Sequence, residues 1–251
     1  FARTADIGAM HVQSLFASVV DLLWVPRCAA CDAVLQDPQR IAESAAFCAP
    51  CGLSLVRAHS PKCPRCGLSF DGEGADHLCG HCLASPPPFE ALFTRYAYGG
   101  ALGDAISRFK YGPAPHLASR LSSLLFEGFS PPQGISLVVP VPLHPKRLRR
   151  RGFNQSMLLI GDAPKSLRRL VSTSVLHRVA DTPHQAGLNR RERLDALRGA
   201  FRARPSPKLE GARVLLVDDV ATTTATIRAA SEALLDAGAA EVYGLCLART
   251  M

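Results

Sequence analysis

Hydrophobic residues near the C-terminus follow the order strand, loop, helix, strand. Residues 214–217 form an unbroken Val/Leu run, which is typical of a parallel strand buried on both faces. An alanine-rich segment with helical periodicity then extends to Gly238, and residues 242–248 form a second apolar run. The chain from residue 89 onward alternates in the same way. Strands are predicted at 93–98 and 135–141, and helices at 101–111, 117–126, 154–170 and 189–197, with Pro164 as a candidate break within 154–170. Such alternation predicts an α/β fold with a mostly parallel sheet flanked by helices.

Two carboxylates, Asp218 and Asp219, directly follow the first apolar run, and a threonine-rich loop, residues 221–226, comes next. Open α/β sheets bind ligands beyond the carboxyl ends of their strands. Backbone N–H groups at a helix N-terminus form an anion site. Two acceptor-only side chains beside such a site indicate a phosphorylated sugar as ligand. The alternative is a core strand whose acids merely cap the next helix.

Composition supports a globular protein with a small additional module. The 251 residues are 47% hydrophobic, enough for one α/β core. Residues 12–25 are apolar, but polar residues interrupt them and Pro26 ends them, so they predict an amphipathic helix within an N-terminal segment, 1–27. A membrane span needs about 20 apolar residues. We therefore expect no membrane span and a cytoplasmic location.

Eight of the nine cysteines form four Cys-x-x-Cys pairs: Cys28/Cys31, Cys48/Cys51, Cys63/Cys66 and Cys79/Cys82. Two such pairs complete a tetrahedral site, so the pattern predicts two structural zinc ions in a double zinc ribbon over residues 28–84. Four disulfides in a secreted domain are the alternative, which the large cysteine-poor remainder disfavours. The pairs combine either sequentially or in an interleaved way. We expect His77 and His81 on the surface and Cys246 in the core.

Positive charge is concentrated in one segment. The formal net charge is +8, and five cations fall within six residues: Lys146, Arg147, Arg149, Arg150 and Arg151. This run could neutralise a diphosphate or bind a nucleic-acid backbone, where cations supply affinity without sequence preference. A solvated basic face is the remaining interpretation.

Several motifs together resemble a known family. Residues 213–229, RVLLVDDVATTTATIRA, resemble the phosphoribosyl diphosphate (PRPP) motif of type I phosphoribosyltransferases. With PVPLHPKRLRRRGFNQS at 140–156, DTPHQAGLNRRER at 181–193, RGAF at 198–201 and the cysteine pairs, the chain is similar to the ComF family of competence-associated phosphoribosyltransferase relatives from about residue 22 onward. The resemblance implies a type I phosphoribosyltransferase-like domain over residues 89–251, after the double zinc ribbon.

The resemblance also implies roles for individual residues. Asp218 and Asp219 would be catalytic and bind the ribose hydroxyls, and PRPP, with Mg²⁺, would further contact the loop residues Ala221, Thr222, Thr223, Thr224, Ala225 and Thr226. A second set would serve the diphosphate, a mobile hood over the site, or nucleic acid: Arg147, Arg149, Arg150, Arg151, Gln185, Arg190 and Arg193.

The chain departs from the family pattern at two positions. Thr224 stands where the family usually has glycine, and Ala196 where it tends to have asparagine. A β-branched residue with positive φ is strained. Either the loop keeps a negative φ at Thr224, or PRPP binding is weakened.

The family resemblance implies a cytoplasmic protein of natural transformation that handles incoming single-stranded DNA, with PRPP or a nucleotide in its site and competence-machinery proteins as candidate partners. Two rival functions use the same motifs. One is a metabolic enzyme that transfers ribose 5-phosphate from PRPP to a base or amine. The other is a non-enzymatic zinc-ribbon adaptor for nucleic acid or protein.

Overall fold

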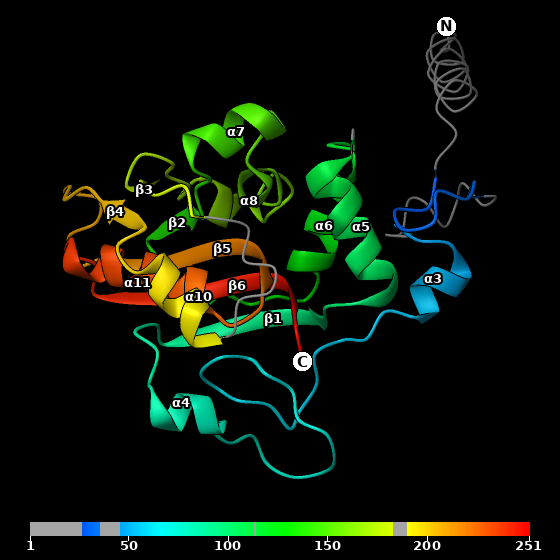
Figure 1. Ribbon diagram of the computed structural model, residues 1–251, viewed down its shortest axis with the longest axis horizontal. Coiled ribbons are helices and arrows are strands. Elements are labelled where there is room, and N and C mark those ends of the chain that lie inside the picture. The colour runs from blue at the N-terminus through cyan, green and yellow to red at the C-terminus, as the bar shows by residue number, and fades with distance from the viewer. Residues whose placement is uncertain (1–26, 36–45, 113, 183–189) are drawn as a thin grey trace, which may run out of the picture.

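A parallel sheet in the order β1-β6-β5-β2 forms the centre of the computed structural model, which describes residues 27–35, 46–112, 114–182 and 190–251 (Figure 1). Its strands are β1 (Ala91–Ala97), β2 (Leu137–Pro140), β5 (Arg213–Ala221) and β6 (Glu241–Arg249). Leu215 of β5 lies opposite Val138 of β2 on one side and Tyr243 of β6 on the other. The predicted mostly parallel α/β sheet is confirmed.

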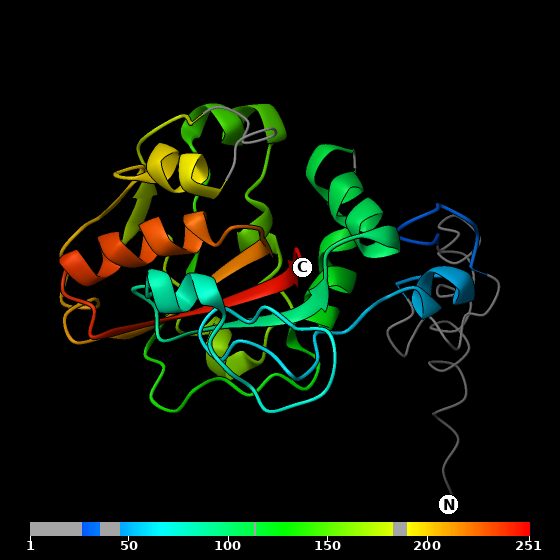
Figure 2. The same cartoon turned by 60° about the horizontal axis from the view of Figure 1, so that its bottom comes forward.

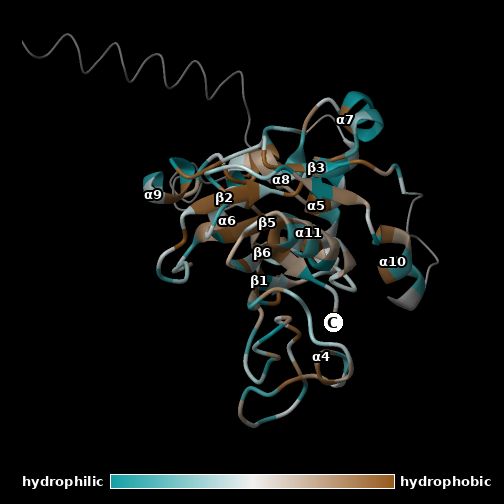
Figure 3. Cartoon of the chain, turned by 90° about the vertical axis from the view of Figure 1, so that its left-hand side faces the viewer, coloured by the Kyte–Doolittle hydropathy of each residue, from teal (hydrophilic) through white to brown (hydrophobic). Residues whose placement is uncertain are grey.

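Helices cover both faces of the sheet. One face packs against α5 (Gly100–Tyr111), α6 (Leu117–Phe126), α8 (Gln155–Leu158) and α9 (Lys165–Arg168). The other packs against α11 (Ala225–Asp236), α10 (Arg190–Leu197) and a hairpin of β3 (Leu176–Arg178) and β4 (Phe201–Ala203). Residues 214–217 are fully buried because Leu215 and Val217 face one layer, and Val214 and Leu216 the other. The apolar colouring of β2 and β5 in Figure 3 follows from this two-sided burial.

The sequence prediction differs from the structure in several places, and one of them is the helix α7 (Pro145–Arg151), which was not predicted. The helix predicted over 154–170 is divided into α8 and α9, with turns over residues 159–162 and the candidate break Pro164 as the residue that precedes α9. Ser122 fixes this break, since its hydroxyl donates to the Leu159 carbonyl at 2.7 Å and accepts from the Asp162 N–H at 3.3 Å. The antiparallel β3–β4 hairpin was not predicted at all.

The zinc-ribbon segment covers the free edge of β1. The Leu92 N–H donates to the Arg65 carbonyl, and the Ala97 N–H to the Val56 carbonyl, both at 2.8 Å. Gly67 has φ +66°, and a Cβ there would lie 2.5 Å from the Leu92 carbonyl oxygen, so only glycine fits this contact. Pairing removes an exposed sheet edge that could otherwise bind another chain. Figure 2 shows this segment, with α4 (Gly80–Ala84), beside β1.

The first cysteine pairs lie elsewhere, near α3 (Ala49–Leu53) and α5 (Figure 1). Arg108 of α5 donates to the carbonyls of Cys28 and Ala29, each at 3.0 Å. The amphipathic helix predicted over 1–27 lies almost wholly outside the described residues. Within the described ranges, no helix has the length and apolarity needed to cross a bilayer.

Candidate functional site

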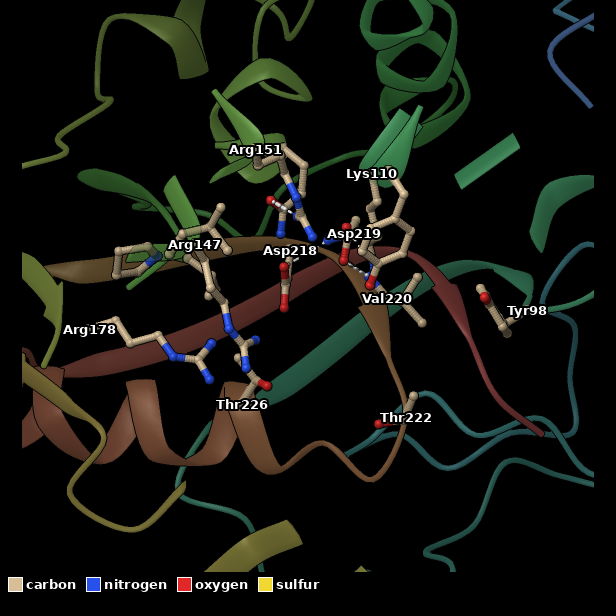
Figure 4. A pocket seen from close by; sticks show the side chains of 15 residues that line it. Tyr98, Lys110, Arg147, Arg151, Arg178, Asp218, Asp219, Val220, Thr222 and Thr226 are labelled. Carbon is tan, nitrogen blue, oxygen red and sulfur yellow. Dashed lines mark hydrogen bonds and ion pairs between the residues drawn. The ribbon is translucent and has the colours of Figure 1, made fainter. Parts of the chain in front are cut away.

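A cavity of about 530 Å³ lies at the carboxyl ends of β2 and β5. It has the size of a small-molecule site. Two acids, four cations and two threonines are prominent in its lining: Asp218, Asp219, Lys110, Arg147, Arg151, Arg178, Thr222 and Thr226 (Figure 4). The fold therefore brings six of the predicted residues to one edge of the sheet: Asp218, Asp219, Thr222, Thr226, Arg147 and Arg151.

The two aspartates have different surroundings. Asp218 Oδ1 accepts from the Ser156 hydroxyl at 2.9 Å and from the Asp219 N–H at 3.0 Å. Asp219 Oδ2 pairs with Lys110 Nζ at 2.9 Å, and its Oδ1 accepts from the Val220 N–H at 2.7 Å. The Asp219 carboxylate thus pairs with Lys110, a residue that the sequence analysis missed, whereas among the described residues no cation forms an ion pair with Asp218 (Figure 4).

Burial and the neighbouring charges set the protonation states of Asp218 and Lys110. Burial, followed by repulsion from Asp219, raises the pKa of Asp218 to about 7, although Lys110 acts in the opposite direction. Burial acts to lower the pKa of Lys110, but the ion pair with Asp219 outweighs it and raises that pKa above its ordinary value. Lys110 therefore stays charged at neutral pH, and Asp218 titrates there.

Asp219→Asn should destabilise the protein by about 3–5 kcal/mol, because it leaves the ammonium of Lys110 in a buried site without its counter-charge. Urea denaturation would measure the loss. The double variant Lys110→Met/Asp219→Asn should recover most of it, since neither charge then remains. Equal stability of Asp219→Asn and the wild type would show that the pair contributes nothing.

The threonine loop, residues 221–226, leads from β5 into α11. Thr224 is the residue before the first turn of α11, is 2% exposed, and has φ +64°. A negative φ at Thr224 is therefore wrong, and of the two alternatives weakened PRPP binding remains the expectation. The Thr223 and Thr224 hydroxyls are buried without a hydrogen-bond partner. A positive φ is costly for a β-branched residue and persists only where its surroundings hold it.

Thr224→Gly should stabilise the protein by about 1 kcal/mol, because glycine removes the backbone strain and the unpartnered buried hydroxyl. The gain is reduced by the greater freedom of glycine in the unfolded chain. Calorimetry should show a melting temperature roughly 2–4 °C higher. Thr226→Gly is the matched control. Because Thr226 lies within α11, glycine there should lower the melting temperature.

The three arginines of the cavity wall come from two elements. Arg147 and Arg151 lie on α7 (Pro145–Arg151), where Arg151 donates to Gln155 Oε1 at 2.6 Å. Arg178 of β3 is 8% exposed and donates to the Thr182 hydroxyl at 2.6 Å. Burial and, next, the neighbouring Arg147 lower the pKa of Arg178. These side chains form a positive wall beside Asp218 (Figure 4).

The remaining basic residues of the prediction are distributed differently. Arg149 and Arg150 are exposed on α7, away from the cavity lining. Their helix is coloured strongly hydrophilic in Figure 3. Arg190 and Arg193 lie on α10, and Gln185 lies outside the described residues. No sequence motif pointed to Arg178. A buried cation in a strand of three residues can be recognised as part of the site only once the fold is known.

The cysteines form two four-thiol groups in the sequential arrangement. The first cluster is Cys28, Cys31, Cys48 and Cys51, and the second cluster is Cys63, Cys66, Cys79 and Cys82. In each, the sulfur atoms lie within 4.8 Å of one another, and Cys31–Cys48 and Cys66–Cys79 are each 3.7 Å apart. A tetrahedral centre with Zn–S bonds of about 2.3 Å has sulfur–sulfur edges of about 3.8 Å, so both clusters fit zinc.

The other residues singled out around the cysteines are where the sequence predicted. His77 and His81 are exposed, and His77 stacks on Phe70 at 4.3 Å between ring centroids. Neither belongs to a cluster. Cys246 is fully buried in β6, which confirms it as a core residue.

Comparisons with known proteins match both parts of the chain. A double zinc ribbon domain family matches residues 19–83, and a phosphoribosyl transferase domain family matches residues 167–251. The DNA utilization protein YhgH of Escherichia coli K12 is 35% identical over 215 residues, which cover 82% of this chain and 91% of that protein. Competence protein F of Haemophilus influenzae is 31% identical over 75% of this chain and 85% of its own length. Competence protein ComFC of Bacillus subtilis is 28% identical, with coverages of 81% and 84%.

Proposed function

Because the chain belongs to the ComF/YhgH family, which joins a double zinc ribbon to a phosphoribosyltransferase domain, we propose that it is a DNA-utilisation protein of competence that binds PRPP or a nucleotide. The observation that carries the proposal is the cavity at the carboxyl ends of β2 and β5. It combines an available carboxylate, a positive wall and a helix N-terminus. Few ligands other than a phosphorylated sugar use all three together.

Each part of PRPP has a counterpart in the cavity. The 5-phosphate would bind at the N-terminus of α11, through loop N–H groups and the hydroxyls of Thr222 and Thr226. Asp218 would accept from a ribose hydroxyl. The diphosphate would lie toward Arg147 and Arg178, where two guanidinium groups balance its charge. Mg²⁺ would be held mainly by diphosphate oxygens and water, with a carboxylate as protein ligand, and would add charge neutralisation.

In a transfer reaction, the bond from the anomeric carbon to the diphosphate oxygen breaks and its electron pair leaves with the diphosphate. The protein's residues would position the sugar and stabilise the negative charge that develops on the departing diphosphate. They would form no covalent bond to the sugar. By the family resemblance, residues 177–200 would form a hood that excludes water from the ribosyl cation. The metabolic phosphoribosyltransferase remains the second candidate function, because the same cavity favours it.

Calorimetric titration with PRPP tests the ligand. We expect binding with Mg²⁺, and weaker binding of ribose 5-phosphate, which lacks the diphosphate. Absence of heat and of thermal stabilisation at millimolar PRPP would reject the sugar-phosphate site and leave the adaptor function. Release of diphosphate with a panel of bases and amines would separate the metabolic enzyme from a binding protein.

Single-stranded DNA should bind through the exposed cations of α7. Fluorescence anisotropy of a labelled oligonucleotide across a salt series should give a linear fall of log affinity with log salt. Arg149→Gln/Arg150→Gln should make that slope shallower by about 0.7 for each phosphate that is no longer neutralised. PRPP affinity should stay unchanged because neither residue lines the cavity. Failure to bind the oligonucleotide at low salt would reject the DNA-binding part of the proposal.

A further inference from the structure

Arg249, the last residue of β6, connects the second cluster with the threonine loop. Its Nη2 donates to Cys66 Sγ at 3.4 Å, and its Nη1 donates to the Thr222 carbonyl at 3.2 Å. The residue is 5% exposed, and its Nε has no hydrogen-bond partner. One buried guanidinium therefore contacts a zinc-ligating sulfur and the backbone of the loop at the same time.

The protein around Arg249 is packed as one unit. The four thiols of the second cluster are 0–6% exposed and belong to the same buried core as Ala221 and Ala225 of the loop and Ile227, which follows it. The Thr94 hydroxyl donates to the Gly67 carbonyl at 2.9 Å, which fixes the cysteine turn to β1. A shift of Cys66 would therefore move Arg249 rather than be absorbed by empty space.

Charge makes the contact stronger than its length suggests. A zinc ion with four thiolates carries a net charge of −2, so the bond from Arg249 to Cys66 is charge-assisted. Among the described residues, no ion pair joins Arg249 to a carboxylate. A buried guanidinium without a counter-charge is costly. The metal-loaded cluster supplies that counter-charge, and hydrogen bonds to ligand sulfurs in turn orient a metal centre.

The loop that Arg249 contacts needs support. Thr224, two residues after the bonded Thr222 carbonyl, has a strained positive φ. We propose that the second zinc centre, acting through Arg249, holds the threonine loop in the conformation that binds phosphate, so that metal binding and PRPP binding are coupled. This inference rests on the proposed function of the loop. It makes Arg249 a positioning residue, and the coupling is reciprocal: whatever disturbs one site changes the other.

Cadmium-113 in place of zinc tests the coupling in the full chain. Two resonances are expected, and Cys31→Ser assigns the first cluster by removing its signal. Addition of PRPP and Mg²⁺ should shift only the signal of the second cluster. In Arg249→Met that signal should move, should no longer respond to PRPP, and PRPP affinity should fall at least tenfold. Arg65→Met is the matched control, because Arg65 lies in the same cysteine turn but pairs with Glu90.

The outcomes are separable. If wild-type protein binds PRPP and neither signal moves, or if Arg249→Met retains full affinity, the coupling is wrong and the proposed function stands. If wild-type protein does not bind PRPP, both are rejected. Should Arg249→Met fail to fold, the response of the two wild-type signals to PRPP decides alone. If the signal of the second cluster also stops responding to PRPP in Arg65→Met, the effect is not specific to Arg249, and Arg249 is then only one of several packing contacts.

Discussion

Replacing Cys63 by serine should cost the protein one zinc ion and most of its stability, whereas Cys31→Ser should remove one zinc ion and leave the sheet folded. The thiol of Cys63 is fully buried in the core that also contains Leu92 and Cys246, but Cys31 is exposed beside α3. Structural zinc contributes an apparent binding free energy on the order of 10 kcal/mol. That equals the whole stability of a typical domain.

Metal analysis by mass spectrometry and thermal melting of both variants would check this asymmetry. Each variant should contain about one zinc per chain, and only Cys63→Ser should lose the cooperative transition of the sheet. Cys246→Ser, in the same core but outside the clusters, is the control for a polar substitution and should retain both zinc ions. Equal melting temperatures of Cys31→Ser and Cys63→Ser would show that the second cluster contributes no more to the stability of the sheet than the first.

Hydrophobic pattern was sufficient to predict the sheet. The Val/Leu run of β5 is unbroken because both faces of that strand are buried, and this alone indicates a parallel central strand. The β3–β4 hairpin was missed because Leu176–Arg178 and Phe201–Ala203 are three residues each, too short to show a period, and lie far apart in the chain. Its existence depends on packing against the sheet.

The residues of the cavity likewise divide into those that the sequence predicted and those that only the fold brought together. Asp218 and the threonine loop are contiguous, so one motif revealed them. Lys110 and Arg178 come from α5 and β3, and only the fold brings them to Asp218. Lys110 in particular lies in the last turn of a helix, where a cation is expected for the helix dipole alone. Arg249, at a strand end, likewise reads as a surface residue until the cysteine turn is placed beside it.

Asp218→Asn should abolish PRPP binding and at the same time make the folded protein more stable at neutral pH. The pKa of Asp218 is raised to about 7, above its value of about 3.9 in an unfolded chain. Between these values the native state binds more protons than the unfolded state, so wild-type stability falls as pH rises from about 4 to about 7. Asparagine removes this cost and its side-chain oxygen can still accept from Ser156.

The opposite expectation follows if the acid only caps the next helix, because loss of a cap lowers stability by about 0.5–2 kcal/mol. Melting curves of both proteins between about pH 4 and pH 8 distinguish the two: the stability gain of Asp218→Asn should grow with pH and level off above about 7. Wild-type affinity for PRPP should weaken as pH falls below about 7, where the carboxylate gains its proton. A variant that melts lower at pH 8 and binds PRPP as the wild type does would assign Asp218 to the helix end and remove it from the site.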